Sequence, residues 1–226
     1  MRSHLFVRRG VALALLAAGC ATTRPPSPAA TGAEPTSEAT EQAVALADRA
    51  RAVVRRCDEE QDATVRAALV REALAAGQGC QQVAPSTPGC DYALALALGV
   101  QAREQRATAL QVLPTMVRLL GAAAAREPGL DFAGPNRVLA ILLVRAPGWP
   151  LGPGDAEAGV DSARRAVALS PDHAPNQAAL AEALRATGDV AGSEAAARRA
   201  VALARKALEA GEPDGARWLR EAERLR

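Results

Sequence analysis

Few side chains of this 226-residue chain are of types that carry out acid–base, nucleophilic or metal chemistry. The chain has one lysine, Lys206, and two histidines, of which only His173 lies beyond the first few residues. The phosphate-binding pattern Gly-x-x-x-x-Gly-Lys and the nucleophile pattern Gly-x-Ser-x-Gly are both absent. The sequence therefore predicts a protein that is not an enzyme and that uses no cofactor.

The cysteines are the next candidates for chemistry. Cys57, Cys80 and Cys90 form no Cys-x-x-Cys pair, and His173 is distant in sequence, so we predict no metal site. The predicted helix between Cys57 and Cys80 separates them by roughly 25 Å, whereas Cys80 and Cys90 flank one loop. We therefore predict a Cys80–Cys90 disulfide, with Cys57 buried or free.

Two further side chains could contact a ligand or a partner. Arg137 precedes an apolar stretch, and its guanidinium can pair with Asp131 or Asp155 to lock the loop after Trp149, or clamp a ligand carboxylate. Trp149 can cover an edge of the fold or anchor a partner, because exposed tryptophans contribute strongly to binding energy. His173 lies in a proline-bounded turn, where we expect it to be exposed and inert.

The N-terminus predicts export and lipidation. Residues 1–19 combine a basic start with a short apolar run that cannot span a bilayer, and Gly19-Cys20 follows. We predict a lipoprotein signal peptide over 1–19 with lipid attached to Cys20, an ordinary cleaved signal being the alternative. Ala21 is typical of lipoproteins sent to the outer membrane, so we expect a lipid anchor on its periplasmic face.

Composition separates a tether from a helical domain. Residues 20–36 are rich in proline, serine, threonine, alanine and glycine, which predicts a disordered tether. Beyond it, alanine and leucine dominate and aromatic residues make up only 2% of the chain, which favours closely packed helices and an all-α domain over 37–226. The formal net charge of +2 gives no indication of nucleic-acid binding.

Apolar residues at helical spacing predict the individual helices of this domain. A hairpin begins with a helix from Ser37 and continues with a second helix after Asp58, and the glycines and prolines of 77–89 should interrupt it. Pro114 should kink or break a later helix. The stretch 136–145 is apolar nearly all round, so we expect it to be the most buried helix.

One phrase of sequence recurs at a fixed offset of 34 residues, first after Gly154-Asp155 and again after Gly188-Asp189. This period is typical of tetratricopeptide (TPR) helix pairs, which stack into a solenoid of antiparallel helices. Each glycine should take a positive φ and each aspartate should cap the helix that follows. The repeat is clearest over 154–206, and its defining residues are Gly154, Asp155, Ala166, Pro171, Leu180, Leu184, Gly188, Asp189 and Ala200. A helix over 213–226, with Trp218 on its apolar stripe, should cap the last repeat.

Three segments carry a resemblance to a known family. Gly-Pro-Asn-Arg-Val-Leu-Ala at 134–140, Ala-Pro-Gly-Trp-Pro at 146–150 and the following Gly154-Asp155 resemble the TatT-type lipoproteins, the periplasmic TPR component beside some tripartite ATP-independent periplasmic transporters. The resemblance includes the lipidated start and is clearest over 91–203. It implies a helical solenoid that assists uptake of small, often apolar or carboxylate-bearing ligands together with a periplasmic solute-binding protein.

Two functions follow from these predictions. The first is a membrane-tethered TPR interaction protein that serves a periplasmic uptake system by docking a solute-binding protein or carrying a ligand. The alternative is an envelope-assembly scaffold that holds peptides or other proteins and binds no small molecule.

Overall fold

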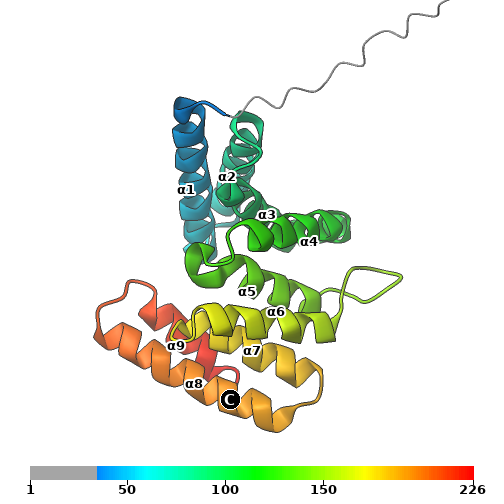
Figure 1. Cartoon of the computed structure of the whole chain (residues 1–226), viewed down its shortest axis with the longest axis vertical. Coiled ribbons are helices and arrows are strands. Elements are labelled where there is room, and N and C mark those ends of the chain that lie inside the picture. Colours follow the sequence, from blue (N-terminus) through cyan, green and yellow to red (C-terminus); the bar gives the residue numbers. More distant parts are fainter. Residues whose placement is uncertain (1–34) are drawn as a thin grey trace, which may run out of the picture. The chain divides into compact units, whose positions relative to one another are not determined.

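The structure, a computed structural model, describes residues 35–226, which form one compact unit. Within this range, nine α-helices and one 3-10 turn follow one another and no strand occurs, so the all-α prediction is confirmed (Figure 1). The signal predicted over 1–19, Cys20 and most of the predicted tether lie outside the described residues. The elements are α1 (Ser37–Glu59), α2 (Ala63–Val83), α3 (Pro88–Glu104), η1 (Arg106–Thr108), α4 (Ala109–Arg126), α5 (Leu130–Arg145), α6 (Ala156–Leu169), α7 (Ala174–Ala186), α8 (Val190–Glu209) and α9 (Gly215–Glu223).

The caps of the first two helices set their bounds. The Thr36 side chain accepts the Ala39 amide at 3.2 Å and caps α1. The second helix begins later than predicted, because Asp62 caps α2 by accepting the Thr64 amide at 2.8 Å. Aspartate at this position satisfies amides that have no partner inside the helix.

α1, α2 and α3 pack on one another through small side chains. The predicted interruption over 77–89 is wrong up to Val83, because α2 continues through Gly77. A Cβ on Gly77 would lie 2.9 Å from the Leu94 Cα of α3. This glycine therefore serves close helix packing and does not break the helix.

A disulfide joins α2 to α3. Cys80 and Cys90, the pair predicted from the spacing, are bonded and both are buried, with their Cα atoms 5.3 Å apart. Cys57 is a buried free cysteine of α1. Burial raises the pKa of its thiol, so Cys57 stays protonated and unreactive near neutral pH.

α4 runs unbroken through Pro114 and buries Met116, Leu119 and Leu120. The helix does not end at Pro114, so the predicted break is absent, although a proline inside the helix removes one backbone hydrogen bond. By length and composition alone, Arg106–Arg126 is apolar enough to cross a membrane, a property that core helices share.

α5 contacts α4, α6 and α7, but it is not the most buried helix. It buries 7 of its 16 residues, whereas α7 buries 7 of 13. Val138 and Ile141 of α5 are only half-buried because they line a cleft described below.

The two copies of the repeated phrase begin just before α6 and α8 and continue into these helices. Asp155 accepts the Ala158 amide at 3.0 Å and Asp189 accepts the Gly192 amide at 2.8 Å, so both aspartates cap as predicted. Gly188 has a φ of 84°, as predicted. The same prediction for Gly154 is wrong, because Gly154 does not have a positive φ. A Cβ on Gly154 would lie 2.1 Å from the Ala146 carbonyl oxygen.

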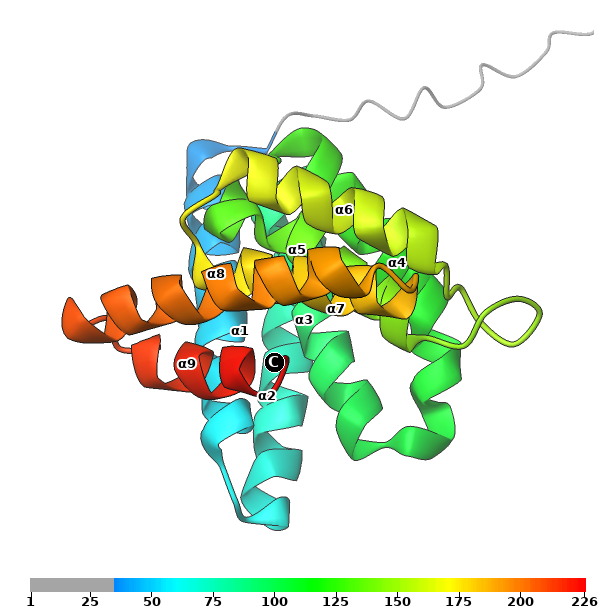
Figure 2. The ribbon, with the colours of Figure 1, turned by 90° about the horizontal axis from the view of Figure 1, so that it is seen from below.

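The apolar positions of the repeat are buried between neighbouring helices. Ala166 and Ala200 are fully buried, Leu184 is buried with Leu180 packed beside it, and Pro171 follows the end of α6. α9 lies along α8 (Figure 2), with Trp218 and Leu219 packed on a cluster that includes Leu203.

Candidate functional site

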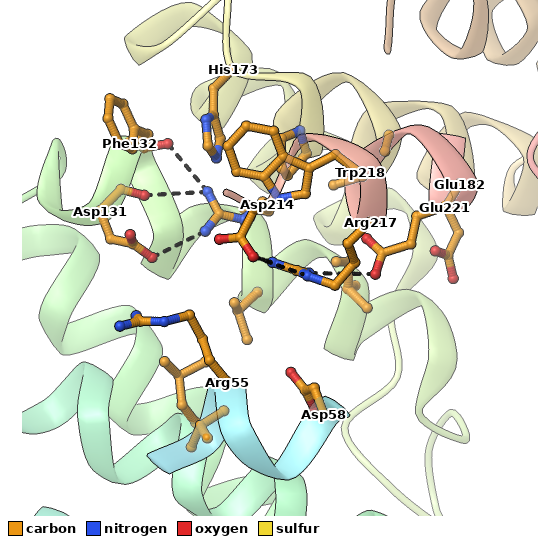
Figure 3. A pocket seen from close by; sticks show the side chains of 18 of the residues that line it. Arg55, Asp58, Asp131, Phe132, His173, Glu182, Asp214, Arg217, Trp218 and Glu221 are labelled. Atoms are coloured by element: carbon orange, nitrogen blue, oxygen red, sulfur yellow. Dashed lines mark hydrogen bonds and ion pairs between the residues drawn. The ribbon is translucent and has the colours of Figure 1, made fainter. Parts of the chain in front are cut away.

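A cleft of about 660 Å³ is lined by side chains of α1, α3, α5, α7 and α9 (Figure 3). Seven arginines and six carboxylates line it, together with an apolar group from α1, α3 and α5. This mixture of charged and apolar groups makes the cleft the best candidate for a binding site in the described part of the chain. The charged residues are Arg51, Arg55, Arg103, Arg137, Arg145, Arg217, Arg224, Asp58, Asp131, Glu182, Glu212, Asp214 and Glu221.

A left-handed turn at the start of α5 forms one wall. Asp131, Phe132 and Ala133 have φ values of 50°, 54° and 64° although none is glycine. Each such residue costs about 1–2 kcal/mol, so surrounding contacts must hold the turn. Strain of this kind is common where a backbone has to present side chains to a site.

Arg137 is the first of these contacts. Its Nη1 donates to the carbonyl oxygens of Asp131 at 3.3 Å and Phe132 at 3.4 Å, and its Nη2 donates to the Asp131 carboxylate at 3.1 Å. Of the two predicted pairings, the one with Asp131 is therefore present, whereas Asp155 caps α6 instead. Arg137 holds the left-handed turn and does not lock the loop after Trp149.

Asn176 links this wall to two other helices. Its Oδ1 accepts a hydrogen bond from Arg137 Nη1 at 3.0 Å. Its Nδ2 lies 3.0 Å from the carbonyl oxygens of Phe132, Ala166 and Ser170. A fully buried asparagine thus joins α7 to the turn of α5 and to the end of α6.

Tyr92 holds the turn from the side of α3. Its hydroxyl donates to the Asp131 carboxylate at 2.7 Å. Burial raises the pKa of Tyr92 well above its usual value, so the hydroxyl remains a donor. A Cβ on Gly134 would lie 2.3 Å from the Tyr92 oxygen, so only glycine admits this contact.

An aromatic stack borders the cleft. The rings of Phe132 and His173 lie parallel with centroids 4.8 Å apart, and Trp218 meets His173 edge-on at 5.0 Å. The expectation that His173 is exposed is wrong, because it is half-buried between these rings. Burial, aided by the charge of Arg137, lowers the pKa of His173 to about 4, so the ring is neutral at pH 7.

Arg55 differs from five of the other six arginines that line the cleft, and only Arg224 resembles it in having no hydrogen bond or ion pair within residues 35–226. Arg145 bonds Glu182 at 2.7 Å and Arg217 pairs with Asp214 at 3.0 Å. Arg55 makes no hydrogen bond or ion pair within residues 35–226, and Figure 3 shows it extending from α1 toward the side of the cleft that carries Asp131. Its guanidinium is therefore available to an anionic group.

The apolar part of the cleft continues into a second hollow. Val54, Leu96, Val138 and Ile141 line both the cleft and a neighbouring hollow of about 450 Å³, whose other walls include Leu113 of α4. A molecule with a charged end and an apolar body would meet both surfaces.

Trp149 lies outside this cleft. It is 91% exposed in the loop between α5 and α6, so the prediction that it covers an edge of the fold is wrong. Of the two predicted contact residues, Arg137 therefore lines the cleft, whereas Trp149 lies outside it and is exposed to solvent.

Reasoning from the sequence missed Arg55, Tyr92, Phe132 and Asn176. None of them belongs to a motif, because their roles depend on contacts between helices distant in sequence. Asn176 gave at most a weak local signal, since asparagine is a poor helix former and yet lies in the first turn of α7.

The described residues contain no group of three or more His, Cys, Asp or Glu side chains that could hold a metal ion. The cleft offers donors, acceptors and apolar surface, which suit binding. Comparison with known proteins finds no protein-family model and no curated protein that matches the sequence.

Proposed function

We propose that this chain is a membrane-tethered TPR-type interaction protein that serves a periplasmic solute-uptake system, and that its cleft binds an apolar molecule with a carboxylate end. It acts by binding, without catalysis, and its protein partner is a periplasmic solute-binding protein. The single observation that carries the ligand assignment is Arg55, which has no ion pair within residues 35–226 and lines the cleft together with the apolar side chains of Val54, Leu96 and Ile141.

The chemistry of the cleft supports a carboxylate-bearing ligand. Arg137 is occupied by Asp131 and Asn176, and the side chain of Arg137 is only 12% exposed. Arg55 is exposed and has no such partner within residues 35–226, so it can pair with a ligand carboxylate without losing an existing ion pair. The adjoining apolar hollow can bury the aliphatic or aromatic part of such a ligand.

The arrangement of the repeated segments supports a TPR-like solenoid. The phrase recurs after 34 residues, α6, α7 and α8 each contact the next helix along the chain, and the small residues of both copies are buried. Solenoids of this type bind partners on surfaces built by successive repeats.

Two features support a location in the cell envelope. The N-terminal residues carry the lipoprotein pattern that ends at Cys20. The Cys80–Cys90 disulfide fits an oxidising compartment such as the periplasm.

The experiment is affinity purification of the full-length lipoprotein from gently solubilised envelopes, with cross-linking, mass spectrometry of the partners and analysis of extracted small molecules. We expect a solute-binding protein and its permease, and an apolar carboxylate in the extract. Arg55→Gln should weaken binding of that carboxylate about tenfold, because a charge-assisted hydrogen bond is lost. Arg56→Gln is the matched control, since Arg56 is the exposed neighbour of Arg55 and does not line the cleft.

Other outcomes separate the parts of the proposal. If outer-membrane barrel or cell-wall assembly proteins copurify and no transporter does, the envelope-assembly scaffold is the better function. Equal ligand binding by the Arg55 and Arg56 variants would show that the ligand carboxylate does not bind to Arg55 in the cleft.

A further inference from the structure

The loop between α5 and α6 is neutral, apolar and stands away from the helices (Figure 2). Residues 146–154 read Ala-Pro-Gly-Trp-Pro-Leu-Gly-Pro-Gly, so the Trp149 indole is their only side chain with a hydrogen-bonding group. Trp149 is 91% exposed and Leu151 is 71% exposed. Two large apolar side chains therefore stand in water at the tip of this loop.

The backbone of the loop is ordered by its own hydrogen bonds. The Gly154 amide donates to the Pro147 carbonyl at 2.9 Å, and the Leu151 and Gly152 amides donate to the Gly148 carbonyl at 3.0 and 3.2 Å. The three prolines have no amide to satisfy. Few backbone donors would lose water if the tip entered a less polar medium, and little ordering would be needed.

The composition of the tip favours one kind of partner. A protein–protein interface usually carries about one hydrogen bond per 100–200 Å² and a polar rim, whereas residues 146–154 offer one polar side-chain group. Tryptophan is the residue enriched at the membrane–water interface, where its ring contacts acyl chains and its N–H reaches polar headgroups. A lipid surface needs no complementary pattern of donors and acceptors.

We propose that this loop inserts into the surface of a lipid bilayer, with Trp149 and Leu151 as the inserting side chains. The contact is separate from the ligand cleft, which neither residue lines. A lipid at Cys20, as the sequence predicts, would hold the loop near the membrane and raise its effective concentration there. The domain would then touch the membrane at a second point with a defined face.

Trp149 and Trp218 are the only tryptophans of the chain, so fluorescence can report on the loop directly. The full-length protein is reconstituted into vesicles of phosphatidylethanolamine and phosphatidylglycerol, with or without brominated acyl chains that quench tryptophan within the bilayer. In Trp218→Phe only Trp149 emits, and we expect brominated lipid to quench it and aqueous acrylamide to quench it weakly. In the matched variant Trp149→Phe, brominated lipid should leave Trp218 unquenched.

Two further variants measure the strength of the contact. Within the Trp218→Phe background, Leu151→Ser should lower the ratio of inserted to free loop about tenfold, because one large apolar side chain no longer leaves water. Val190→Ser, at another exposed apolar position that is 62% exposed, should leave this ratio unchanged.

Two results would overturn the proposal. If acrylamide quenches Trp149 fully and brominated lipid does not, the loop stays in water. If Trp149 is protected from both quenchers, the loop is buried in a protein contact such as one with a second copy of the chain. Neither result would contradict the proposed binding of a carboxylate at Arg55, which is tested separately.

Discussion

The two copies of the repeated phrase have the same sequence at their ends but different surroundings. Leu169 closes the first copy and is 46% exposed, whereas Leu203 closes the second and is 8% exposed. α6 packs between α5 and α7, and α8 packs between α7 and α9, but only Leu203 lies in a buried cluster, together with Trp218 and Leu219 of α9. The repeated residues thus form a helix in both places. Whether the last leucine of the copy is buried, and so contributes to stability, depends on the neighbouring helices.

The glycines that open the two copies differ in the same way. Gly188 has a positive φ and no atom within 4 Å of a Cβ placed on it. Gly154 lacks the positive φ, but the Ala146 carbonyl oxygen occupies the position where its side chain would begin. One residue type therefore meets a conformational need in one copy and a steric need in the other.

The leucine pair gives the largest expected difference in stability. Leu203→Ala should lower the free energy of unfolding by about 3 kcal/mol, because it removes buried apolar atoms beneath α9. Leu169→Ala should change it by less than about 0.5 kcal/mol, because the side chain is half in water. Denaturant unfolding of both variants measures this difference, and equal losses would contradict the different roles assigned to the two leucines.

The glycine pair should give a smaller but diagnostic difference. Gly154→Ala should cost about 2 kcal/mol, because the new Cβ meets backbone atoms that cannot move independently. Gly188→Ala should cost about 1 kcal/mol, which is the conformational penalty of a left-handed residue.

Asparagine at each position tests the two causes separately. Asparagine tolerates the left-handed conformation, so Gly188→Asn should recover part of the stability lost in Gly188→Ala. Gly154→Asn should be no better than Gly154→Ala. Recovery at both positions would show that the steric account of Gly154 is wrong.

Whether a feature could be predicted from the sequence depends on how far apart in the chain its contacting residues lie. Both aspartate caps and the pairing of Arg137 with Asp131 involve residues a few positions apart. The sequence predicted the two caps and indicated Asp131 as one of two candidate partners of Arg137. The left-handed turn at Asp131 was not predicted, because it contains no glycine within its three residues and depends on contacts from α3 and α7. Asn176 illustrates the same limit, since its partner Arg137 lies 39 residues away.

The cleft was beyond prediction for a related reason. It is built by five helices, from α1 to α9, and no local pattern indicates that Arg55 and Trp218 line one cavity. Gly77 shows how a local signal can mislead. The glycine content predicted the end of a helix, whereas Gly77 lies inside α2 and its lack of a side chain allows close packing against Leu94.

The positions that follow the two copies should differ in their response to pH. His173 lies in the turn between α6 and α7, whereas Ala207, which stands 34 residues later, lies within α8 and cannot titrate. The pKa of His173 is about 4 in the folded chain, and that of an unfolded histidine is about 6.5. Between these values the unfolded chain binds more protons, so the contribution of His173 to stability is complete above about pH 6.5 and falls as the pH drops toward 4.

His173→Phe tests this difference because it keeps an aromatic ring between Phe132 and Trp218 but cannot titrate. The loss of unfolding free energy between pH 7 and pH 5.5 should be smaller in the variant than in the natural chain, since His173 is the only histidine within residues 35–226. The effect should be modest, because the ring is only half-buried and solvent screens part of the penalty. Urea titrations at the two pH values measure it. Equal losses in both proteins would mean that protonated His173 is accommodated in the folded stack, and the pH response would then have to come from carboxylates elsewhere.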